Sequence, residues 1–339
     1  MASVLSCCEI MCTRERRCSP SGTNFVVEHD SSADTSNNKH IVFFIDILLN
    51  LGYTIPPKWK KILQIYKNPR RNKVDLHHFN SIKKEKRMLS KQLLKLIRSL
   101  EQKKYRKESN LFVAEGRKTV CDLLASGLRC EKILATREWL DTYKLETKAA
   151  IIEVSDDELR RASFLRAPQG ILALFEQRNE PLDPAVATKE LCLALDEVQD
   201  PGNLGTIVRI ADWFGIEHIF CSMGTADIYN PKTVQATMGA IGRVRLHYTN
   251  LPQLLASLKG QTPIYGTFLD GENMYEKEIL SRGIIIMGNE GNGIGPECAA
   301  SVTERLFIPN YPAGRPTSES LNVSMATAII CAEARRRMM

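Results

Sequence analysis

Three stretches of the sequence place polar side chains beside glycine or proline in spacings that can serve chemistry. The first, LDEVQDPGNLGTIVRIADWFG over residues 195–215, carries Asn203 and, six residues later, Arg209. By itself this stretch favours a structural interpretation. Asn203 would lie at a helix N-cap position, and Arg209 would lie within an apolar helix face with its head in solvent.

The second stretch, IIIMGNEGNGIG over residues 284–295, has four glycines within eight residues directly after an apolar strand. Glycine is needed where the backbone approaches a ligand closely or adopts a positive φ. The spacing differs from the dinucleotide fingerprint GxGxxG, and no Gly-Lys-Ser/Thr follows as in a P-loop. Glu290 lies in the middle of this loop, where a carboxylate is expected to have a partner.

The third stretch, IPNYPAGRPTSESLNVSMATAIICAEARRR over residues 308–337, leaves a strand at Ile308 and enters an irregular loop. A strongly apolar helix follows, which either Ser320 or Asn322 is placed to cap. Its basic end, residues 335–337, suits the negative pole of the helix dipole.

Short apolar runs alternate with helical patterns from residue 190 onward. Such runs predict a parallel sheet covered by helices on both faces, with its functional loops at the carboxyl ends of the strands. The expected strands are Leu191–Asp196, His218–Ser222, Arg243–Tyr248, Pro263–Leu269, Gly283–Met287 and Glu304–Pro309. The expected helices are Leu204–Phe214, Lys232–Met238, Pro252–Leu258 and Leu321–Arg336.

Residues 88–178 predict a separate small α/β domain, which a linker over 179–189 joins to the rest. A helical pattern follows Met88, and strands are expected at 111–116, 132–136, 151–154 and 170–176, with helices at 119–125 and 156–162. Residues 1–87 are expected to form a partly disordered N-terminal extension of unknown role, and Met88 could be a second start site. The apolar run Ile41–Ile55 is too short to span a membrane and predicts a buried helix or strand.

The net charge of +7 is unevenly distributed, because residues 56–107 hold eighteen Lys/Arg against three acids. This block favours either a polyanionic partner such as nucleic acid or a solvated leader, and charge alone leaves both open. The ten cysteines include no CxxC pair, so we expect no metal site. Without a secretory signal, a reducing cytoplasm is the expected compartment, with no membrane association.

Taken together and in this order, the three stretches resemble the signature motifs of the SpoU-type (TrmH-like) RNA ribose 2′-O-methyltransferases of the SPOUT superfamily. The resemblance covers roughly 190–339, extends more loosely over 88–176, and leaves out 1–87. The stretch from Pro309 to Ser320 is longer than the family's loop. The matching residues are Asn203, Gly205 and Arg209; Gly288, Asn289, Glu290, Gly291 and Gly293; and Ile308, Pro309, Ser320, Leu321, Asn322, Val323 and Ser324.

This resemblance implies an α/β fold in which a trefoil-knotted parallel-sheet SPOUT domain follows a small α/β substrate-binding domain. It implies a homodimer, with a site near the interface that uses both subunits. The implied reaction moves a methyl group from S-adenosylmethionine to a ribose 2′-hydroxyl of RNA, with ribosomal RNA favoured over transfer RNA. One alternative is an inactive RNA-binding or ribosome-assembly factor on the same fold. A nucleotide-dependent oxidoreductase ranks far below, since its glycine fingerprint is missing.

The resemblance also assigns site residues. Arg209 is either the base that activates the hydroxyl or a charged group that stabilises the developing alkoxide. The second role is favoured, because an arginine loses its proton at pH 7 only at a cost of about 8 kcal/mol. The implied catalytic residues are Asn203, Arg209, Glu290, Ser320 and Asn322. The implied cofactor-binding residues are Thr267, Phe268, Leu269, Gly288, Asn289, Gly293, Ile308, Pro309 and Leu321.

The basic block generates a prediction about RNA affinity. We expect steeply salt-dependent RNA binding that weakens when Lys103, Lys104, Arg106 and Lys107 are neutralised, because each cation that meets a phosphate releases counterions. Filter binding over a salt series measures this, and an affinity that is the same at low and high salt would contradict it.

Overall fold

The computed structural model describes residues 89–339, except positions 146, 180, 313–314, 316–317, 319 and 339. All described residues belong to one compact unit of the chain. The extension expected over 1–87, the apolar run Ile41–Ile55 within it, and the start of a helix at Met88 lie outside the described residues.

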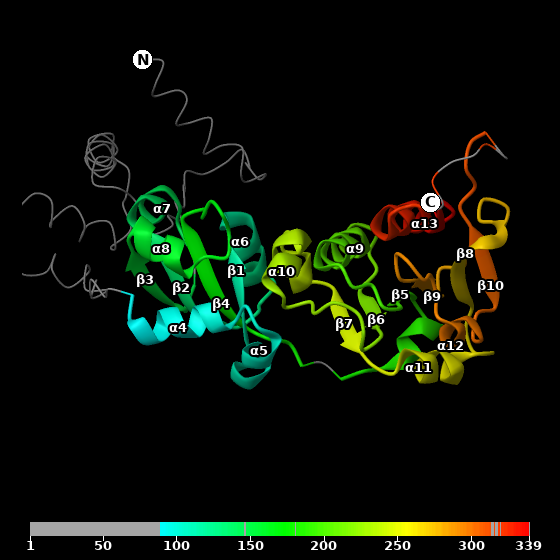
Figure 1. Cartoon of the computed structure of the whole chain (residues 1–339), viewed down its shortest axis with the longest axis horizontal. Coiled ribbons are helices and arrows are strands. Elements are labelled where there is room, and N and C mark those ends of the chain that lie inside the picture. The colour runs from blue at the N-terminus through cyan, green and yellow to red at the C-terminus, as the bar shows by residue number, and fades with distance from the viewer. Residues whose placement is uncertain are drawn as a thin grey trace, which may run out of the picture. The chain divides into compact units, whose positions relative to one another are not determined.

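Residues 91–176 fold around a four-stranded sheet of order β1-β4-β2-β3, in which only β2 and β3 run parallel (Figure 1). The strands are β1 (Leu111–Glu115), β2 (Cys130–Thr136), β3 (Ala150–Val154) and β4 (Ile171–Glu176). The helices are α4 (Lys91–Ser99), α5 (Lys103–Ser109), α6 (Arg117–Ala125), α7 (Arg137–Thr142) and α8 (Asp156–Ala162). The expected small α/β domain is therefore confirmed.

Local sequence explains most of these elements. Ser90 caps α4 by accepting a hydrogen bond from the Leu93 amide, and Ser155 with Glu158 forms a capping box at α8. Helices α5 and α7 were not predicted. Helix α5 has the sequence KKYRKES, in which no apolar periodicity is visible.

Residues 191–336 fold around a six-stranded sheet of order β10-β8-β9-β5-β6-β7, and every neighbouring pair is parallel. Its strands are β5 (Leu191–Leu195), β6 (His218–Cys221), β7 (Arg245–Tyr248), β8 (Ile264–Asn273), β9 (Gly283–Met287) and β10 (Glu304–Phe307). Its α-helices are α9 (Pro201–Trp213), α10 (Pro231–Thr237), α11 (Leu251–Leu258), α12 (Pro296–Ala299) and α13 (Val323–Arg336). Two 3₁₀ helices, η1 (Pro184–Thr188) and η2 (Ala240–Gly242), complete this part.

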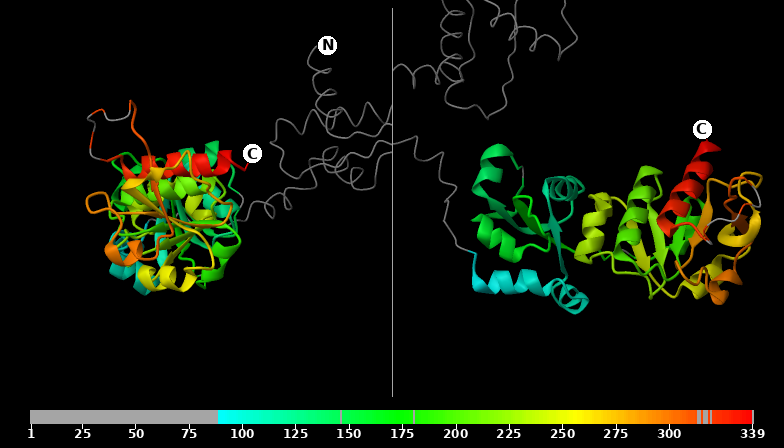
Figure 2. Two further views of the ribbon diagram at one scale, coloured as in Figure 1. Left: turned by 90° about the vertical axis from the view of Figure 1, so that its right-hand side faces the viewer. Right: turned by 45° about the horizontal axis from the view of Figure 1, so that its top comes forward.

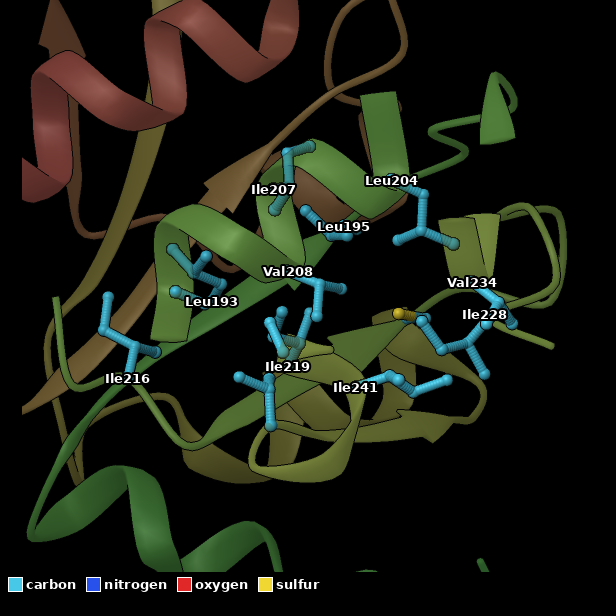
Figure 3. Close-up of a cluster of buried hydrophobic side chains, with 14 of the residues drawn as sticks. Leu193, Leu195, Leu204, Ile207, Val208, Ile216, Ile219, Ile228, Val234 and Ile241 are labelled. Atoms are coloured by element: carbon cyan, nitrogen blue, oxygen red, sulfur yellow. The ribbon is translucent and has the colours of Figure 1, made fainter. Parts of the chain in front are cut away.

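Alternate residues of the central strand β5 face opposite layers of helices, as expected for a sheet buried on both sides. Leu193 and Leu195 belong to the core on the side of α9 and α13, whereas Cys192 and Ala194 belong to the core with α11. Figure 3 shows the first layer, in which α9 lies over β5 and β6. The predicted parallel sheet with two covered faces is thus confirmed. The trefoil knot stays an expectation from the family resemblance.

Several expected boundaries differ from the structure, most of them by one to three residues. The strand expected to end at Leu269 continues as β8 to Asn273, and its pairing with β10 shifts register between Arg305 and Leu306. Half of the expected linker, residues 179–189, forms η1, in which Ala187 is fully buried. The division into domains and linker stays a prediction.

The last turn of α13 fixes two other segments. Helices α13 and α9 lie side by side (Figures 1 and 2). Arg335 donates to the carbonyls of Phe214 and Gly215 at the end of α9, at 2.7 and 2.9 Å. Arg337 donates to carbonyls of residues 274, 275 and 277 after β8. The arginines expected only to complement their own helix dipole therefore hold neighbouring segments in place.

Glu333, which is buried, organises this arginine cluster and generates a stability prediction. Hydrogen bonds from Arg336 and Arg337, at 2.7 and 2.6 Å, lower the pKa of Glu333 to about 2. A carboxylate whose pKa is lower in the folded state raises the free energy of unfolding at pH values above its unfolded pKa of about 4.3. This contribution is lost as the pH falls from about 4.3 towards the pKa of the folded state. We expect Glu333→Gln to lower the Tm at neutral pH, and the difference from the wild type to shrink between pH 4 and pH 2.

Thermal unfolding followed by circular dichroism over this pH range measures the difference. The matched control is Glu217→Gln, which removes an exposed carboxylate. A Tm difference for Glu333→Gln that stays constant down to pH 2 would show that this carboxylate does not act through its charge.

Candidate active site

The three chemically suggestive stretches meet at the carboxyl ends of the large sheet. Residues 196–203 follow β5 and enter α9, residues 288–295 follow β9, and residues 308–322 connect β10 to α13. Because β5 and β9 are hydrogen-bonded neighbours and parallel, their outgoing loops emerge side by side. The candidate site thus lies where open α/β sheets place their ligands.

A chain of side-chain hydrogen bonds joins all three loops. The Asn203 Nδ2 donates to Glu290 Oε1 at 2.8 Å, and the Asn322 Nδ2 donates to Asn203 Oδ1 at 3.1 Å. Ser324 Oγ extends the chain by donating to Asn322 Oδ1 at 2.6 Å. Since Asn203 uses its amide as donor on one side and acceptor on the other, its orientation is determined. The partner expected for Glu290 is therefore Asn203.

The N-cap assigned to Asn203 was wrong. Helix α9 begins at Pro201, and its cap is Asp200, whose Oδ1 accepts a hydrogen bond from the Asn203 amide at 2.8 Å. That bond, assisted by the Lys232 ammonium 3.1 Å from Oδ2, lowers the pKa of Asp200. A cap three residues earlier leaves the Asn203 side chain free to point at the other two loops. The aspartate directly before a proline was the signal that could have identified it.

Asn289 holds the glycine loop in its shape. Its Oδ1 accepts from the amides of Gly291 and Asn292 at 2.9 and 3.0 Å, and its Nδ2 donates to the Glu197 carbonyl at 2.8 Å. Glu197 has a φ of 57°, a left-handed conformation that non-glycine residues rarely adopt. This contact, which the sequence did not reveal, fixes the glycine loop against the loop after β5.

Position 288 has no room for a side chain, so a glycine is required there. A Cβ there would lie 2.2 Å from the carbonyl carbon of Gly293 and 2.4 Å from the amide nitrogen of Ile294. Gly293 itself has a φ of 69° and exchanges two backbone hydrogen bonds of 2.9 Å with Asn289. The loop therefore folds back tightly on the end of β9 and fills the space that a side chain at position 288 would need.

The remaining predicted cofactor residues follow the ends of β8 and β10 or precede α13. Ile308 and Pro309 are half-buried, whereas Leu269 and Leu321 are 69% and 50% exposed. Thr267 donates from its Oγ1 to the Ile286 carbonyl at 3.2 Å.

Phe268 differs from these neighbours. Its ring packs with the core on the side of α11, with the Arg305 guanidinium 3.5 Å from the ring centroid. Any contact that Phe268 makes with a cofactor would therefore come from its backbone.

Arg209 and Ser320 stand outside the hydrogen-bonded chain. Arg209 is exposed, so its head lies in solvent as expected, but it lies on the side of α9 opposite the buried apolar residues. Within the described residues it makes no hydrogen bond or ion pair, which leaves all five guanidinium N–H groups for a ligand. Ser320 is also exposed, at the approach to α13.

Metal and cysteine chemistry find no support among the described residues. In residues 89–339 with the stated gaps, no three His, Cys, Asp or Glu side chains gather as a metal site. The same part of the chain has no helix that combines the length and apolar character needed to cross a bilayer. Burial raises the pKa of Cys192, Cys298 and Cys331 to about 12, which leaves too little thiolate for nucleophilic catalysis.

Comparisons with known proteins agree with this fold. A family model described as SpoU rRNA Methylase family matches residues 190–332, and one described as MRM3-like substrate binding domain matches residues 91–173. The chain is 33% identical over 235 residues to the 23S rRNA (guanosine(2553)-2′-O)-methyltransferase RlmP of Bacillus subtilis, covering 69% of this chain and 92% of that protein.

Two solved structures are also similar. A TrmH-family protein from Porphyromonas gingivalis shares 42% identity with a TM-score of 0.67, over 74% of this chain and all of that one. An AdoMet-bound rRNA methyltransferase from Sinorhizobium meliloti shares 30% identity with a TM-score of 0.65, over 75% and 98% of the two chains.

These comparisons identify an RNA ribose 2′-O-methyltransferase of the SPOUT type that uses S-adenosylmethionine, which confirms the expected class and cofactor, and the parallel sheet agrees with that class. The chain belongs to the SpoU rRNA methylase family.

The glycine loop generates a prediction about cofactor affinity. Gly288→Ala has to displace backbone of residues 293–294, so we expect S-adenosylmethionine to bind about tenfold more weakly or worse, which is a loss of roughly 1.4 kcal/mol. Isothermal titration calorimetry measures this. The matched control is Gly291→Ala, whose Cβ would meet only Asn289 Oδ1 at 3.5 Å. Equal affinities for the two variants would show that the fold of this loop does not govern cofactor binding.

Proposed function

We propose that this protein methylates a ribose 2′-hydroxyl of ribosomal RNA and that Asn203, Arg209, Glu290, Ser320 and Asn322 form its catalytic site. The observation that carries the proposal is the hydrogen-bonded chain Glu290–Asn203–Asn322, which ties three loops of the sheet into one polar surface. The predicted site residues that lie far apart in the sequence, 87 and 119 positions, are in direct contact there.

The surface around the glycine loop fits S-adenosylmethionine. The close packing at Gly288 lets the glycine loop fold against the end of β9, and exposed Leu269 and Leu321 with half-buried Ile308 supply apolar walls for an adenine. When bound, this cofactor supplies an electrophilic methyl group. Thr267, Asn289, Gly293 and Pro309 complete the set of residues that we assign to its binding.

Arg209 is proposed to act as a fixed positive charge. It is exposed, has no partner among the described residues, and lies on the helix whose first turn carries Asn203. A planar guanidinium can bind a phosphate of the RNA with two parallel hydrogen bonds and stabilise negative charge that develops on the 2′-oxygen. Asn203 and Asn322 would orient the ribose, and Glu290 would hold Asn203. The proton would leave to an RNA phosphate oxygen or to water.

RNA affinity is proposed to come from the small domain, on its exposed lysines. Lys103, Lys104 and Lys107 of α5 are all exposed, and Lys104 retains 75% of its side-chain surface. Arg106 was wrongly included in this group. It is only 2% exposed and is paired with Asp227, so it cannot meet a phosphate. The salt-dependence test therefore applies to the three lysines alone.

A homodimer is proposed from the apolar surface next to the site. Trp213 at the end of α9 is 84% exposed and Met325 of α13 is 60% exposed, although large apolar side chains are usually covered. A twofold partner would cover both helices, which lie side by side, and bring its own polar residues to Arg209. Sedimentation equilibrium tests this, and a fully active monomer would contradict it.

Ribosomal rather than transfer RNA as the substrate, and a cytoplasmic location, complete the proposal. The substrate-binding domain match over 91–173 and the RlmP likeness favour ribosomal RNA.

The six described cysteines are all free, which favours a reducing compartment. A fluorescent fusion confined to an organelle would contradict the location. The competing function is an RNA-binding or assembly factor without activity, which predicts that S-adenosylmethionine does not bind.

The role of Arg209 generates the central activity prediction. We expect Arg209→Lys to lower turnover by roughly 100-fold or more, because lysine keeps the charge but loses the planar fork. S-adenosylmethionine affinity should be unchanged. The assay transfers isotopically labelled methyl groups to unmodified ribosomal and transfer RNA pools, with nucleosides identified by mass spectrometry.

The matched control is Arg282→Lys, an exposed arginine in the segment before β9. Turnover of Arg209→Lys within a few-fold of the wild type would exclude the proposed role. If the wild type labels only transfer RNA, the substrate assignment falls; if it labels neither pool and binds no cofactor, the assembly-factor function is favoured.

A further inference from the structure

The small domain and the methyltransferase domain share one continuous hydrophobic core. Phe112 of β1 lies with its ring centroid 4.9 Å from that of Tyr229, which precedes α10. Val120 and Leu123 of α6 belong to the same buried cluster as Ile241 in η2. Domains that move independently bury little apolar surface against each other, so this core favours a fixed arrangement.

Two glycines allow the backbones of the domains to approach closely. A Cβ on Gly239 would lie 2.6 Å from the Cβ of Asp122, and a Cβ on Gly242 would lie 2.5 Å from the Oγ of Ser126. Both neighbours come from the α6 region of the small domain. Any larger side chain at these positions would separate the domains, so the contact depends on residue size.

A buried ion pair fixes one side of this contact. Arg106 of α5 is 2% exposed, and its Nε and Nη2 donate to Asp227 Oδ2 at 3.2 and 2.6 Å. Its Nη1 donates to the carbonyls of Leu100 and Glu101 at 2.8 and 2.7 Å. Asp227 Oδ1 accepts from the Tyr229 amide at 3.1 Å. An arginine with such complete partners holds two segments in a single relative position.

The start of the connecting segment is fixed at the same place. Gln177 Nε2 donates to the carbonyls of Arg106 and Leu111 at 2.7 and 3.1 Å. The Arg178 amide donates to the Tyr229 hydroxyl at 2.8 Å. The chain therefore leaves the small domain while bonded to both sides of the contact, and a free hinge at this point is excluded.

The contact is linked to the active site through α10. Helix α10 starts four residues after Asp227, and its Lys232 reaches the Asp200 carboxylate that caps α9. Helix α9 lies so close to α10 that a Cβ on Gly205 would be 2.5 Å from the Cβ of Ala236. The first turn of α9 carries Asn203, so a shift of α10 moves the residue that joins the three loops.

From these contacts we infer that Arg106 and Asp227 are positioning residues. They hold the small domain and the methyltransferase domain in one fixed arrangement, and the two domains bind RNA as a rigid unit. RNA held by the small domain then presents its ribose at a fixed distance from the site. Displacing a reactant by an ångström lowers the reaction rate far more than it lowers the affinity. A fixed arrangement of the two domains therefore favours methylation of a single nucleotide of the RNA. The RNA part of this inference rests on the proposed function.

The test separates positioning from folding and from charge. We expect Arg106→Met and Asp227→Asn to lower kcat more than they change the KM for RNA and to label additional riboses, with kcat/KM about tenfold lower or worse. S-adenosylmethionine affinity should stay within twofold, which shows that the site still folds. Hydrogen exchange should increase in α5 and in residues 225–229. The charge control is Arg129→Met, since Arg129 is 80% exposed on the small domain.

Gly242→Ala provides a second route, because it keeps the ion pair but forces the domains apart. Gly242→Ala should produce the same additional methylation sites as Arg106→Met. If Arg106→Met does not fold, Gly242→Ala alone tests whether the domain arrangement controls the methylation sites. Unchanged methylation sites, kcat/KM and exchange in Gly242→Ala and in the folded variants would overturn the inference. A wild-type protein that methylates no RNA would refute the proposed function. The hydrogen-exchange measurement would still test whether the ion pair holds the two domains in a fixed arrangement.

Discussion

The side-chain amide of Asn203 is the interaction on which the site depends. Its nitrogen needs an acceptor and its oxygen needs a donor, and Glu290 and Asn322 supply one each. Among side chains of the same shape, aspartate lacks the donor and leucine lacks both the donor and the acceptor. The three loops that come from distant parts of the chain are therefore joined through a residue whose orientation cannot be reversed without losing both bonds.

The rest of the methyltransferase domain can be understood as the support for that amide. Asp200 caps α9 and so sets the position of Asn203, while α9 packs its apolar face on β5 and β6 (Figure 3). The glycine loop is held by Asn289, which reaches the carbonyl of Glu197 in its left-handed conformation. Backbone strain of this kind persists only where the surroundings determine it, and here the surroundings are the neighbouring loop.

Sequence patterns predicted the parts of the fold that depend on local chemistry. The strands of the large sheet are apolar runs between helices, and the glycine spacing after β9 marks a close backbone approach. Contacts that depend on distant partners were not predictable. Arg106 lies in a run of charged residues that favours a polyanionic partner or a solvated segment, and only Asp227, 121 positions away, explains its burial. The cap of α9 was misplaced because aspartate and asparagine, three residues apart, are equally good caps.

The distances along the chain between the linked site residues have a consequence for folding. Asn203 meets Glu290 across 87 positions and Asn322 across 119, so the site forms only after most of the large sheet is paired. Loops of this length close slowly compared with local helices and hairpins. The small domain, whose sheet is complete by residue 176, has no such requirement. A refolding chain should therefore recover native-like secondary structure before it recovers catalytic competence, and partly folded forms will be able to hold RNA without modifying it.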